Sequence, residues 1–197
     1  MAWEYILTNQ LTPKLTAAQQ ENNATIIAQY FRGLGWTDNA IAAMLGNMDA
    51  ESNGLNPAQF QQGFAMYTQS GGFGLVQWTP RTKYSNWAGS DWATNYDKQL
   101  QRIKYEYDNP DTQWSWRPGY ERYISFYEFA HSNDSVYFLT GAFLYYYEGP
   151  QNPQASIGYR RSRAEHWYEY ITGVPPAPVN NIPIWLLFKL RWNNKGR

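Results

Sequence analysis

The apolar residues between positions 37 and 51 repeat with the period of an α-helix. They fall at i, i+3, i+4 and i+7, so they share one helical face (Ile41, Met44, Leu45 and Met48). Thr37 is a good N-cap for this helix, and Gly54 can supply a left-handed residue beyond its end. Glu51 follows this run, so the pattern predicts a carboxyl group on the apolar side of the helix end.

The same period recurs along most of the chain. Further helices are expected at about 22–35, 96–109, 120–131, 136–147 and 160–171. The first of these is expected to begin at Asn22 or Asn23, both good N-caps. The helix expected at 120–131 would direct Tyr120, Tyr123 and Tyr127 towards the core.

Residues 55–92 break the helical pattern and contain a cluster of glycines. Within them, residues 65–68 and 73–78 are expected to form short strands around a turn at 70–72. The predicted fold class is therefore α+β, mainly α, with a small β-containing lobe that faces Glu51.

The two ends of the chain differ from its middle. Residues 1–20 begin with alternating apolar positions and are expected to form an extended arm. A proline-rich stretch at 173–178 predicts a semi-rigid linker, and residues 182–192 beyond it are largely apolar. The expected organisation is an N-terminal arm (1–20), one domain (21–172), and a linker with a C-terminal docking tail (173–197).

Composition narrows the class of protein. The formal net charge is zero, which argues against a nucleic-acid partner. There are no cysteines, so neither disulfide bonds nor thiolate metal sites are expected. Aromatic residues make up 18% of the chain, an excess that suits both core packing and the stacking of sugar rings. The N-terminus lacks the pattern of a secretory signal, and the apolar stretch at 182–190 is too short to span a bilayer.

Glu51 is the first candidate for chemistry. Burial at an apolar helix end raises the pKa of a carboxyl group, as a general acid near neutral pH requires. The lobe that follows contains Gln77 and Trp78, which are expected to form the opposite wall of a cleft. Gln77 can hydrogen-bond to a sugar or a water, and Trp78 can stack on a sugar ring or anchor the lobe. Tyr67 and Thr68 are further candidates for holding a water there.

Two motifs make the chain resemble a known family. Glu51-Ser52 followed by Gly74-Leu75-Val76-Gln77 resembles the Glu-Ser … Gly-Leu-x-Gln signature of goose-type lysozymes and lytic transglycosylases. The fuller pattern from Ile41 to Pro57, continued from Gly74 to Arg81, is similar to the core of the phage tail lysozyme family. Weaker matches follow at Gln99-Leu100 with Glu106, at Tyr147-Glu148 with Gly149-Pro150, and at Arg163-Ala164. The resemblance covers about residues 22–172.

This resemblance implies a lysozyme-like fold that cuts the β-1,4 bond between N-acetylmuramic acid and N-acetylglucosamine in peptidoglycan. It implies that Glu51 is the catalytic acid and that Gln77 and Trp78 belong to the cleft. It also places Glu148 at a family position. There we expect a structural role, as a buried carboxylate paired with an arginine of the last helix (Arg160, Arg161 or Arg163).

A second catalytic carboxylate is harder to find. Glycoside hydrolysis usually needs two, but residues 52–80 contain neither Asp nor Glu. Asp49 is about 200° from Glu51 around the helix and is expected to point away, and Asp91 and Asp97 have no supporting pattern. Either a water held by the polar residues of the lobe attacks the sugar, or the hydroxyl of muramic acid attacks and leaves a 1,6-anhydro product. The closer resemblance to tail lysozymes favours hydrolysis.

Metal and cofactor chemistry is not indicated. The run from Asp49 to Gly54 imitates the start of a calcium loop, but the twelfth position is Phe60 and offers no bidentate carboxylate. His131 and His166 are the only histidines and form no His-Glu-x-x-His zinc motif.

Three functions fit these features. The preferred one is a lysin carried in the phage tail that opens the bacterial wall for genome entry. Its N-terminal arm and residues 182–197 would bind proteins of the phage tail. Contact between residues 182–197 and a membrane surface is the second interpretation of that segment. The alternatives are a tail component that holds wall sugars without cutting them, and a free endolysin. The residues after Thr172 are too few for the folded wall-binding module that an endolysin would need.

Overall fold

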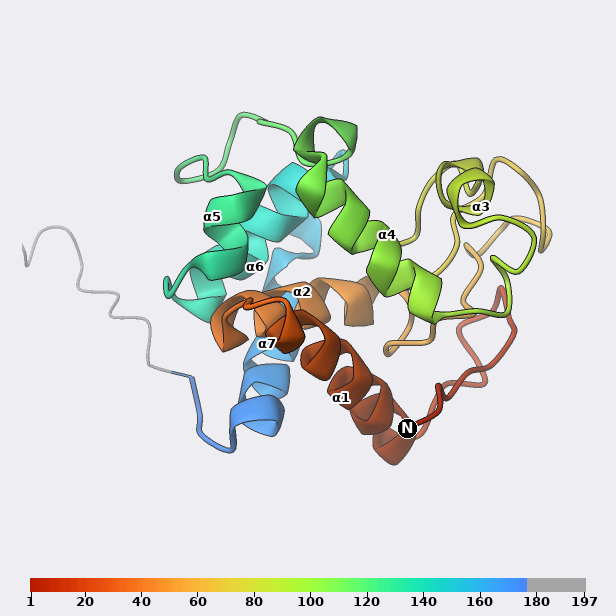
Figure 1. The fold of residues 1–197 in the computed structure, drawn as a ribbon, viewed down its shortest axis with the longest axis horizontal. Helices are drawn as coiled ribbons and strands as arrows, with labels where there is room; N and C mark the ends of the chain where they lie inside the picture. The colour runs from red at the N-terminus through yellow and green to blue at the C-terminus, as the bar shows by residue number, and fades with distance from the viewer. Residues whose placement is uncertain (177–197) are drawn as a thin grey trace, which may run out of the picture.

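The computed structural model describes residues 1–176, apart from the side chain of residue 111. The helices in this part are α1 (Ala17–Gly33), α2 (Asp38–Glu51), α3 (Thr82–Ala88), α4 (Asp97–Asp108), α5 (Phe126–His131), α6 (Val136–Phe143) and α7 (Ile157–Thr172). A π-helical turn η2 (Leu144–Glu148) continues α6, and two 3₁₀ turns are η1 (Pro110–Thr112) and η3 (Pro153–Ala155). The predicted mainly α fold is confirmed, and the arrangement is consistent with a lysozyme-like domain (Figure 1).

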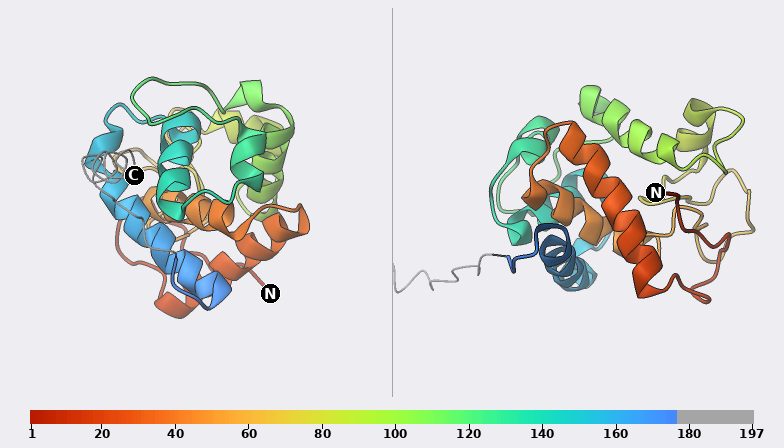
Figure 2. Two further views of the ribbon diagram at one scale, coloured as in Figure 1. Left: turned by 90° about the vertical axis from the view of Figure 1, so that its left-hand side faces the viewer. Right: turned by 60° about the horizontal axis from the view of Figure 1, so that its bottom comes forward.

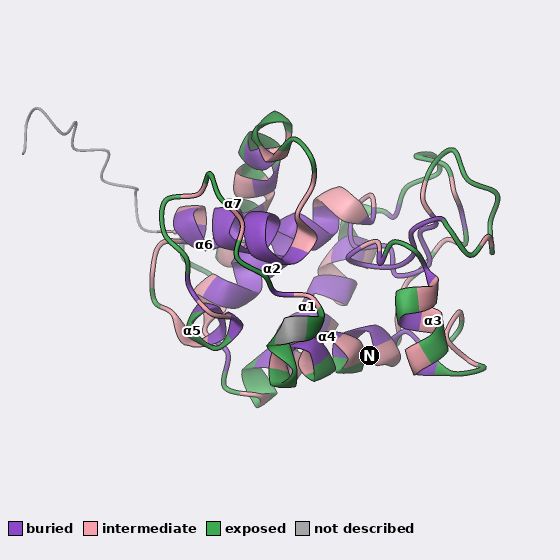
Figure 3. Ribbon diagram, turned by 90° about the horizontal axis from the view of Figure 1, so that it is seen from above, coloured by how far each residue is buried: buried purple, intermediate pink, exposed green. Residues whose placement is uncertain are grey.

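Helix α2 is the centre of the domain. Thr37 caps it, as the sequence predicted, by accepting a hydrogen bond from the Ala40 amide. Every residue from Ala40 to Asp49 is buried (Figure 3). Helices α1, α5, α6 and α7 all pack on it. Most of this helix is apolar or small, and its two buried polar residues, Asn47 and Asp49, have hydrogen-bond partners, so it can be enclosed on all sides.

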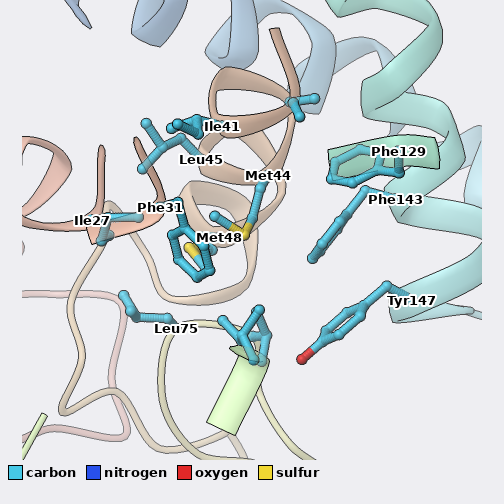
Figure 4. Close-up of a cluster of buried hydrophobic side chains, with 14 of the residues drawn as sticks. Ile27, Phe31, Ile41, Met44, Leu45, Met48, Leu75, Phe129, Phe143 and Tyr147 are labelled. Carbon is cyan, nitrogen blue, oxygen red and sulfur yellow. The ribbon is translucent and has the colours of Figure 1, made fainter. Parts of the chain in front are cut away.

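The core around α2 is rich in aromatic rings. Met44 and Met48 of α2 lie between Phe31 of α1 and the Phe143 and Tyr147 rings (Figure 4). Behind them Trp114 stacks on Phe126, with ring centroids 4.5 Å apart. Much of the aromatic excess is therefore used in core packing, where large rings contribute most of the buried area.

The predicted strands at 65–68 and 73–78 are wrong. In residues 1–176 the only β pairing consists of two isolated bridges, Thr8 with Gln59 and Phe60 with Phe73. Tyr67, Gly74 and Gln77 have φ of +68°, +86° and +48°, and such left-handed residues turn the chain where a strand would extend it. The lobe is instead a looped segment followed by α3, a helix that the sequence pattern did not predict.

Two predicted helix starts are also wrong. Helix α1 begins at Ala17, because Thr16 and Gln19 form a capping box upstream of the expected caps. The segment before α5 is not helical, since Ser125 and Glu128 form another capping box that starts the helix there. Tyr127 is consequently exposed rather than directed inwards, as is Tyr123.

The N-terminal segment lies against the domain. Asn23 accepts a hydrogen bond from the Glu4 amide and donates one to the Glu4 carbonyl. Asn56 makes the same pair of bonds with Ile6. Figure 2 shows this segment running beside the looped lobe. The division at residues 20 and 172 stays a prediction, and the docking tail at 182–197 lies outside the described residues.

Within residues 1–176, no helix combines the length and hydrophobicity that crossing a membrane requires.

Gly46 allows α7 to pack closely on α2. A Cβ at this position would lie 2.5 Å from the Arg160 carbonyl oxygen and 2.6 Å from Ala164 Cβ. Gly46→Ala should therefore force the two helices apart and lower the free energy of unfolding by about 1–3 kcal/mol. Urea unfolding followed by circular dichroism measures this change.

Gly158→Ala is the matched control. Gly158 lies in α7, and a Cβ there would meet nothing within 4 Å. This variant should keep or raise the stability by up to about 1 kcal/mol, since alanine favours a helix over glycine. Equal effects of the two substitutions would contradict the packing argument.

Candidate functional site

An open cleft of about 790 Å³ lies at the C-terminal end of α2. Its walls come from α2, from the loops around residues 59–62 and 76–79, and from the segment at 148–151 after η2. Glu51 and Glu148 both line it, together with Gln77 and Trp78. The cleft therefore joins segments that lie far apart in the sequence.

Glu51 is the last residue of α2, and its side chain is 23% exposed. The Arg160 guanidinium of α7 forms an ion pair with Glu51 Oε1. The same guanidinium donates to Asn47 Oδ1 at 3.1 Å and to the Ser156 hydroxyl at 3.2 Å. A carboxylate at a helix C-terminus faces the negative end of the helix dipole, and Arg160 offsets this repulsion.

Glu148 lies across the cleft at the end of η2. Its Oε1 atom is fully buried and has no hydrogen-bond partner among the described residues, although the residue as a whole is only half-buried. Burial raises the pKa of Glu148 well above its usual value, the charge of Glu51 raises it further, and Arg160 acts in the opposite direction. Burial and the neighbouring charge of Glu51 thus both favour the uncharged form of Glu148.

The predicted ion pair of Glu148 is wrong. Arg160 pairs with Glu51. Arg163 pairs with the buried Asp49 at 2.8 Å, and Arg161 lies over the Tyr137 ring and donates to its carbonyl. None of the three arginines in α7 thus neutralises Glu148. The sequence placed Glu148 at a family position, but only the fold shows which carboxylate each arginine binds.

Trp78 is held in place by a buried carboxyl group. Its indole donates to Glu106 at 3.0 Å, and its ring stacks on Tyr84 at a centroid distance of 4.8 Å. Glu106 also binds Arg102 and the Tyr147 hydroxyl. Since only 2% of Trp78 is exposed, its ring serves mainly to anchor the lobe.

The side chain of Gln77 is held in place by hydrogen bonds from its amide group. Its Nε2 donates to the carbonyls of Gln59 at 3.0 Å and Gly74 at 2.9 Å. Both donor hydrogens of this amide are thereby used within the lobe. The amide oxygen is the polar atom of Gln77 that remains to accept a hydrogen bond from a ligand in the cleft.

Tyr67 and Thr68 are not among the residues that line the cleft. The Tyr67 ring packs on Phe60 and Trp92, and Arg81 binds the carbonyl oxygens of both residues. The structure therefore brings Gln77 and Trp78 to the same cleft as Glu51, whereas Tyr67 and Thr68 lie outside it.

The other carboxylates considered as a second catalytic group have structural partners. Asp49 is fully buried and accepts a hydrogen bond from the Trp167 indole in addition to its ion pair with Arg163. Asp91 binds Lys98, and Asp97 accepts from the Trp3 indole. Within residues 1–176, no three His, Asp or Glu side chains gather as a metal ion would need.

Comparison with known proteins shows the family of the chain. A family model described as phage tail lysozyme matches residues 22–171. The chain belongs to the phage tail lysozyme family. It is also 42% identical over 161 residues to morphogenesis protein 1 of Bacillus phage B103. That match covers 81% of this chain and 42% of the relative, so the chain spans less than half the length of that protein.

The buried acid Glu148 should make the stability of this tail lysozyme domain depend on pH. A folded pKa above the unfolded value of 4.5 means that the native state holds a proton which the unfolded state releases. The stabilisation is complete below pH 4.5 and is lost as the pH rises through the folded pKa. Glu148→Gln should therefore match the wild type in thermal stability near pH 4 and exceed it at pH 7–8.

Thermal unfolding across this pH range tests the prediction. Glu165→Gln, on the exposed side of α7, controls for the loss of one carboxyl group. A stability gain for Glu148→Gln that is the same at every pH would show that burial of the charge is not its cause.

Proposed function

We propose that this protein cleaves the glycan strands of bacterial peptidoglycan at the β-1,4 bond between N-acetylmuramic acid and N-acetylglucosamine. The observation that carries the proposal is the cleft with two carboxyl groups, Glu51 and Glu148, in a domain of the phage tail lysozyme family. Glycosidases work with such a pair across the bond that they break. Glu51 is the general acid in this proposal, the role that the sequence resemblance implied for it.

The polar lining of the cleft suits an amide-bearing, acidic glycan. Gln77 offers an amide oxygen at the wall, where it can accept a hydrogen bond from an N-acetyl group or a hydroxyl. Lys83 and Arg117 also line the cleft, and each can bind the lactyl or peptide carboxylates that muramic acid carries. Trp78 stays in the proposed substrate-binding set as a residue that lines the cleft, whereas Tyr67 and Thr68 are left out of it.

The attacking group is water or the C6 hydroxyl of muramic acid. Water gives a reducing sugar, whereas the hydroxyl gives a 1,6-anhydro product, as in lytic transglycosylases. We favour hydrolysis, because the family that the chain belongs to is named for lysozymes. A mass spectrum of the digest separates the two outcomes, which differ by one water.

We propose the phage tail as the place of action, with the wall opened during genome entry. The family description and the morphogenesis protein of phage B103 support an association with the virion. Tail proteins are the proposed partners, bound through residues 182–197 and the N-terminal arm. The packing of residues 4–8 on the domain leaves the exposed side chains of Tyr5 and Leu7 as the arm's apolar contacts.

A second candidate is a tail component that holds wall sugars without cutting them. The name of the phage B103 relative, which refers to morphogenesis rather than to hydrolysis, favours this alternative. The buried, unpartnered acid Glu148 opposes it, because a spacer gains nothing from the free-energy cost of such a group.

Glu51→Gln should abolish lysis while leaving the fold intact. A carboxyl group that takes part in proton transfer contributes about 10²–10⁴-fold to the rate, so clearing of purified peptidoglycan should fall by at least about 100-fold. Turbidity loss measures the activity, and circular dichroism with thermal unfolding verifies the fold.

Glu165→Gln is the matched control and should clear walls at the wild-type rate, since Glu165 is exposed on α7. A wild-type protein that binds walls without releasing soluble fragments would support the non-catalytic alternative. Wild-type activity in Glu51→Gln would remove Glu51 from the proposed mechanism.

A further inference from the structure

Arg160 of α7 is a buried cation beside the proposed general acid. Its side chain is 7% exposed, and each of its three guanidinium nitrogens donates to a different side chain. Nε donates to the Ser156 hydroxyl at 3.2 Å, Nη1 donates to Asn47 Oδ1 at 3.1 Å, and Nη2 donates to Glu51 Oε1. Two of these contacts hold the planar guanidinium in place, so the third is directed at Glu51 in a fixed geometry.

Asn47 supports the arginine through an amide whose orientation is determined. Its Nδ2 donates to the carbonyls of Ala43 at 2.9 Å and Thr140 at 3.1 Å. Both donor hydrogens are therefore used, and the amide oxygen is the atom that faces Arg160. Asn47 is fully buried and lies one helical turn before Glu51 in α2. The helix that carries the acid thus also carries the support for the arginine that binds it.

The ion pair leaves one carboxyl oxygen of Glu51 open. Arg160 binds Oε1, and Oε2 has no hydrogen-bond partner among residues 1–176. The side chain of Glu51 is 23% exposed and lines the cleft. Oε2 is therefore the oxygen that can carry a proton to a substrate.

Building on the proposed function, we infer that Arg160 is the positioning residue of the general acid: it fixes the carboxyl group of Glu51 for proton transfer and stabilises the carboxylate that the transfer leaves. Loss of the proton creates a negative charge at the C-terminal end of α2, where the helix dipole disfavours it. A cation that is already in place stabilises this charge as it develops, more than it stabilises the neutral acid. Arg160 therefore acts on kcat and leaves substrate binding unchanged.

The chemical step balances with these roles. The proton of Glu51 moves to the glycosidic oxygen while the bond between that oxygen and C1 of muramic acid breaks, and the electron pair of the bond goes to the oxygen. The oxygen of the attacking water, or of the C6 hydroxyl, bonds to C1 and releases a proton. That proton, taken up directly or through solvent, returns Glu51 to its acid form. The guanidinium exchanges no proton, because arginine stays charged in proteins.

Arg163 provides a comparison within the same pair of helices. It binds Asp49 Oδ2 at 2.8 Å, and Asp49 Oδ1 accepts a hydrogen bond from the Tyr159 hydroxyl at 3.3 Å. Both oxygens of this fully buried carboxylate thus have donors, whereas Glu51 keeps one oxygen open. The two arginines neutralise neighbouring carboxylates of α2, but only Arg160 does so for a group that can transfer a proton.

Arg160→Ala should lower kcat and leave KM unchanged. Removal of a preorganised donor that acts on the transition state costs about 10²–10³-fold in kcat, so we expect a loss of at least about 100-fold with less than about a threefold change in KM. The substrate is solubilised, uncrosslinked peptidoglycan, and mass spectrometry of the released fragments measures the rate. Thermal unfolding verifies that the variant is folded.

Arg163→Ala is the matched control. It should lower the midpoint of thermal unfolding at least as much as Arg160→Ala, because it leaves the fully buried Asp49 without its cation. The kcat of the folded protein should nevertheless stay within about threefold of the wild type, since this ion pair does not reach the acid.

Two lysine variants make the same comparison with the charge retained, and they serve if an alanine variant does not fold. An ammonium group cannot reach Ser156, Asn47 and Glu51 together, as the planar guanidinium does. Arg160→Lys should therefore lose at least about tenfold in kcat at an unchanged KM, and Arg163→Lys less than about threefold.

Free guanidinium ion tests whether Arg160 acts through Glu51. In Arg160→Ala, millimolar guanidinium chloride should raise kcat at least about fivefold above the value in the same concentration of sodium chloride, because the ion can occupy the vacated position. It should have no effect on the wild type, or on a double variant that combines Arg160→Ala with Glu51→Gln. An equal rise in the double variant would show that the ion acts elsewhere and would overturn the inference.

The outcomes separate this inference from the proposed function. If the wild type releases no fragments from peptidoglycan, the proposed function fails. If the wild type cleaves and Glu51→Gln does not, but Arg160→Ala keeps the wild-type kcat or changes only KM, the positioning role is wrong while the function stands. Equal losses of kcat in folded Arg160 and Arg163 variants would likewise reduce Arg160 to a structural residue.

Discussion

The close packing of α7 on α2 is the contact on which the cleft depends. Gly46 has no side chain to keep the helices apart, so the backbone of α7 at Arg160 approaches α2 directly. From that position the Arg160 side chain reaches Asn47 and Glu51. One turn further along α7, Arg163 reaches the buried Asp49. A single glycine thereby lets one helix neutralise two carboxylates of its neighbour.

The opposite wall depends on a second buried carboxyl group. Glu106 of α4 binds the Trp78 indole of the lobe and the Tyr147 hydroxyl of η2. Burial raises the pKa of Glu106, and its hydrogen bonds to Tyr147, Arg102 and Trp78 oppose that shift. Because Glu148 follows Tyr147 directly, the network that secures the lobe also sets where Glu148 lies. The ion pair of Arg160 with Glu51 thus positions one wall of the cleft, and the hydrogen bonds of Glu106 position the other.

Glu148 stands out against this background because it is not saturated. Its buried oxygen has no partner in the described chain, and its charged form is disfavoured by burial and by Glu51. Groups that lower the stability of the fold and make no compensating structural contact are expected at functional sites. Burial of this carboxyl group therefore has a free-energy cost in its charged form.

The helical core was predictable from the sequence, because the period of apolar residues is a local property. Thr37 and the face from Ile41 to Met48 identified α2, and the position of Glu51 at its end followed from helical geometry. The resemblance identified the family from the Glu51-Ser52 and Gly74–Gln77 motifs. These features need no knowledge of which segments meet in space.

The lobe and the charge pairing were decided by the tertiary structure. Left-handed residues such as Tyr67 and Gln77 replaced the predicted strands with turns. Arg81 donates a hydrogen bond to the Tyr67 carbonyl, and the Gln77 amide N–H donates to the Gly74 carbonyl. Nothing in the spacing of α7 shows that Arg160 binds Glu51 rather than Glu148. Which arginine a carboxylate binds depends on the distance between them and on their burial. Both are set only when helices that are far apart in the sequence pack together. The sequence therefore determined where Glu51 lies along its helix, and only the fold determined that Arg160 binds it.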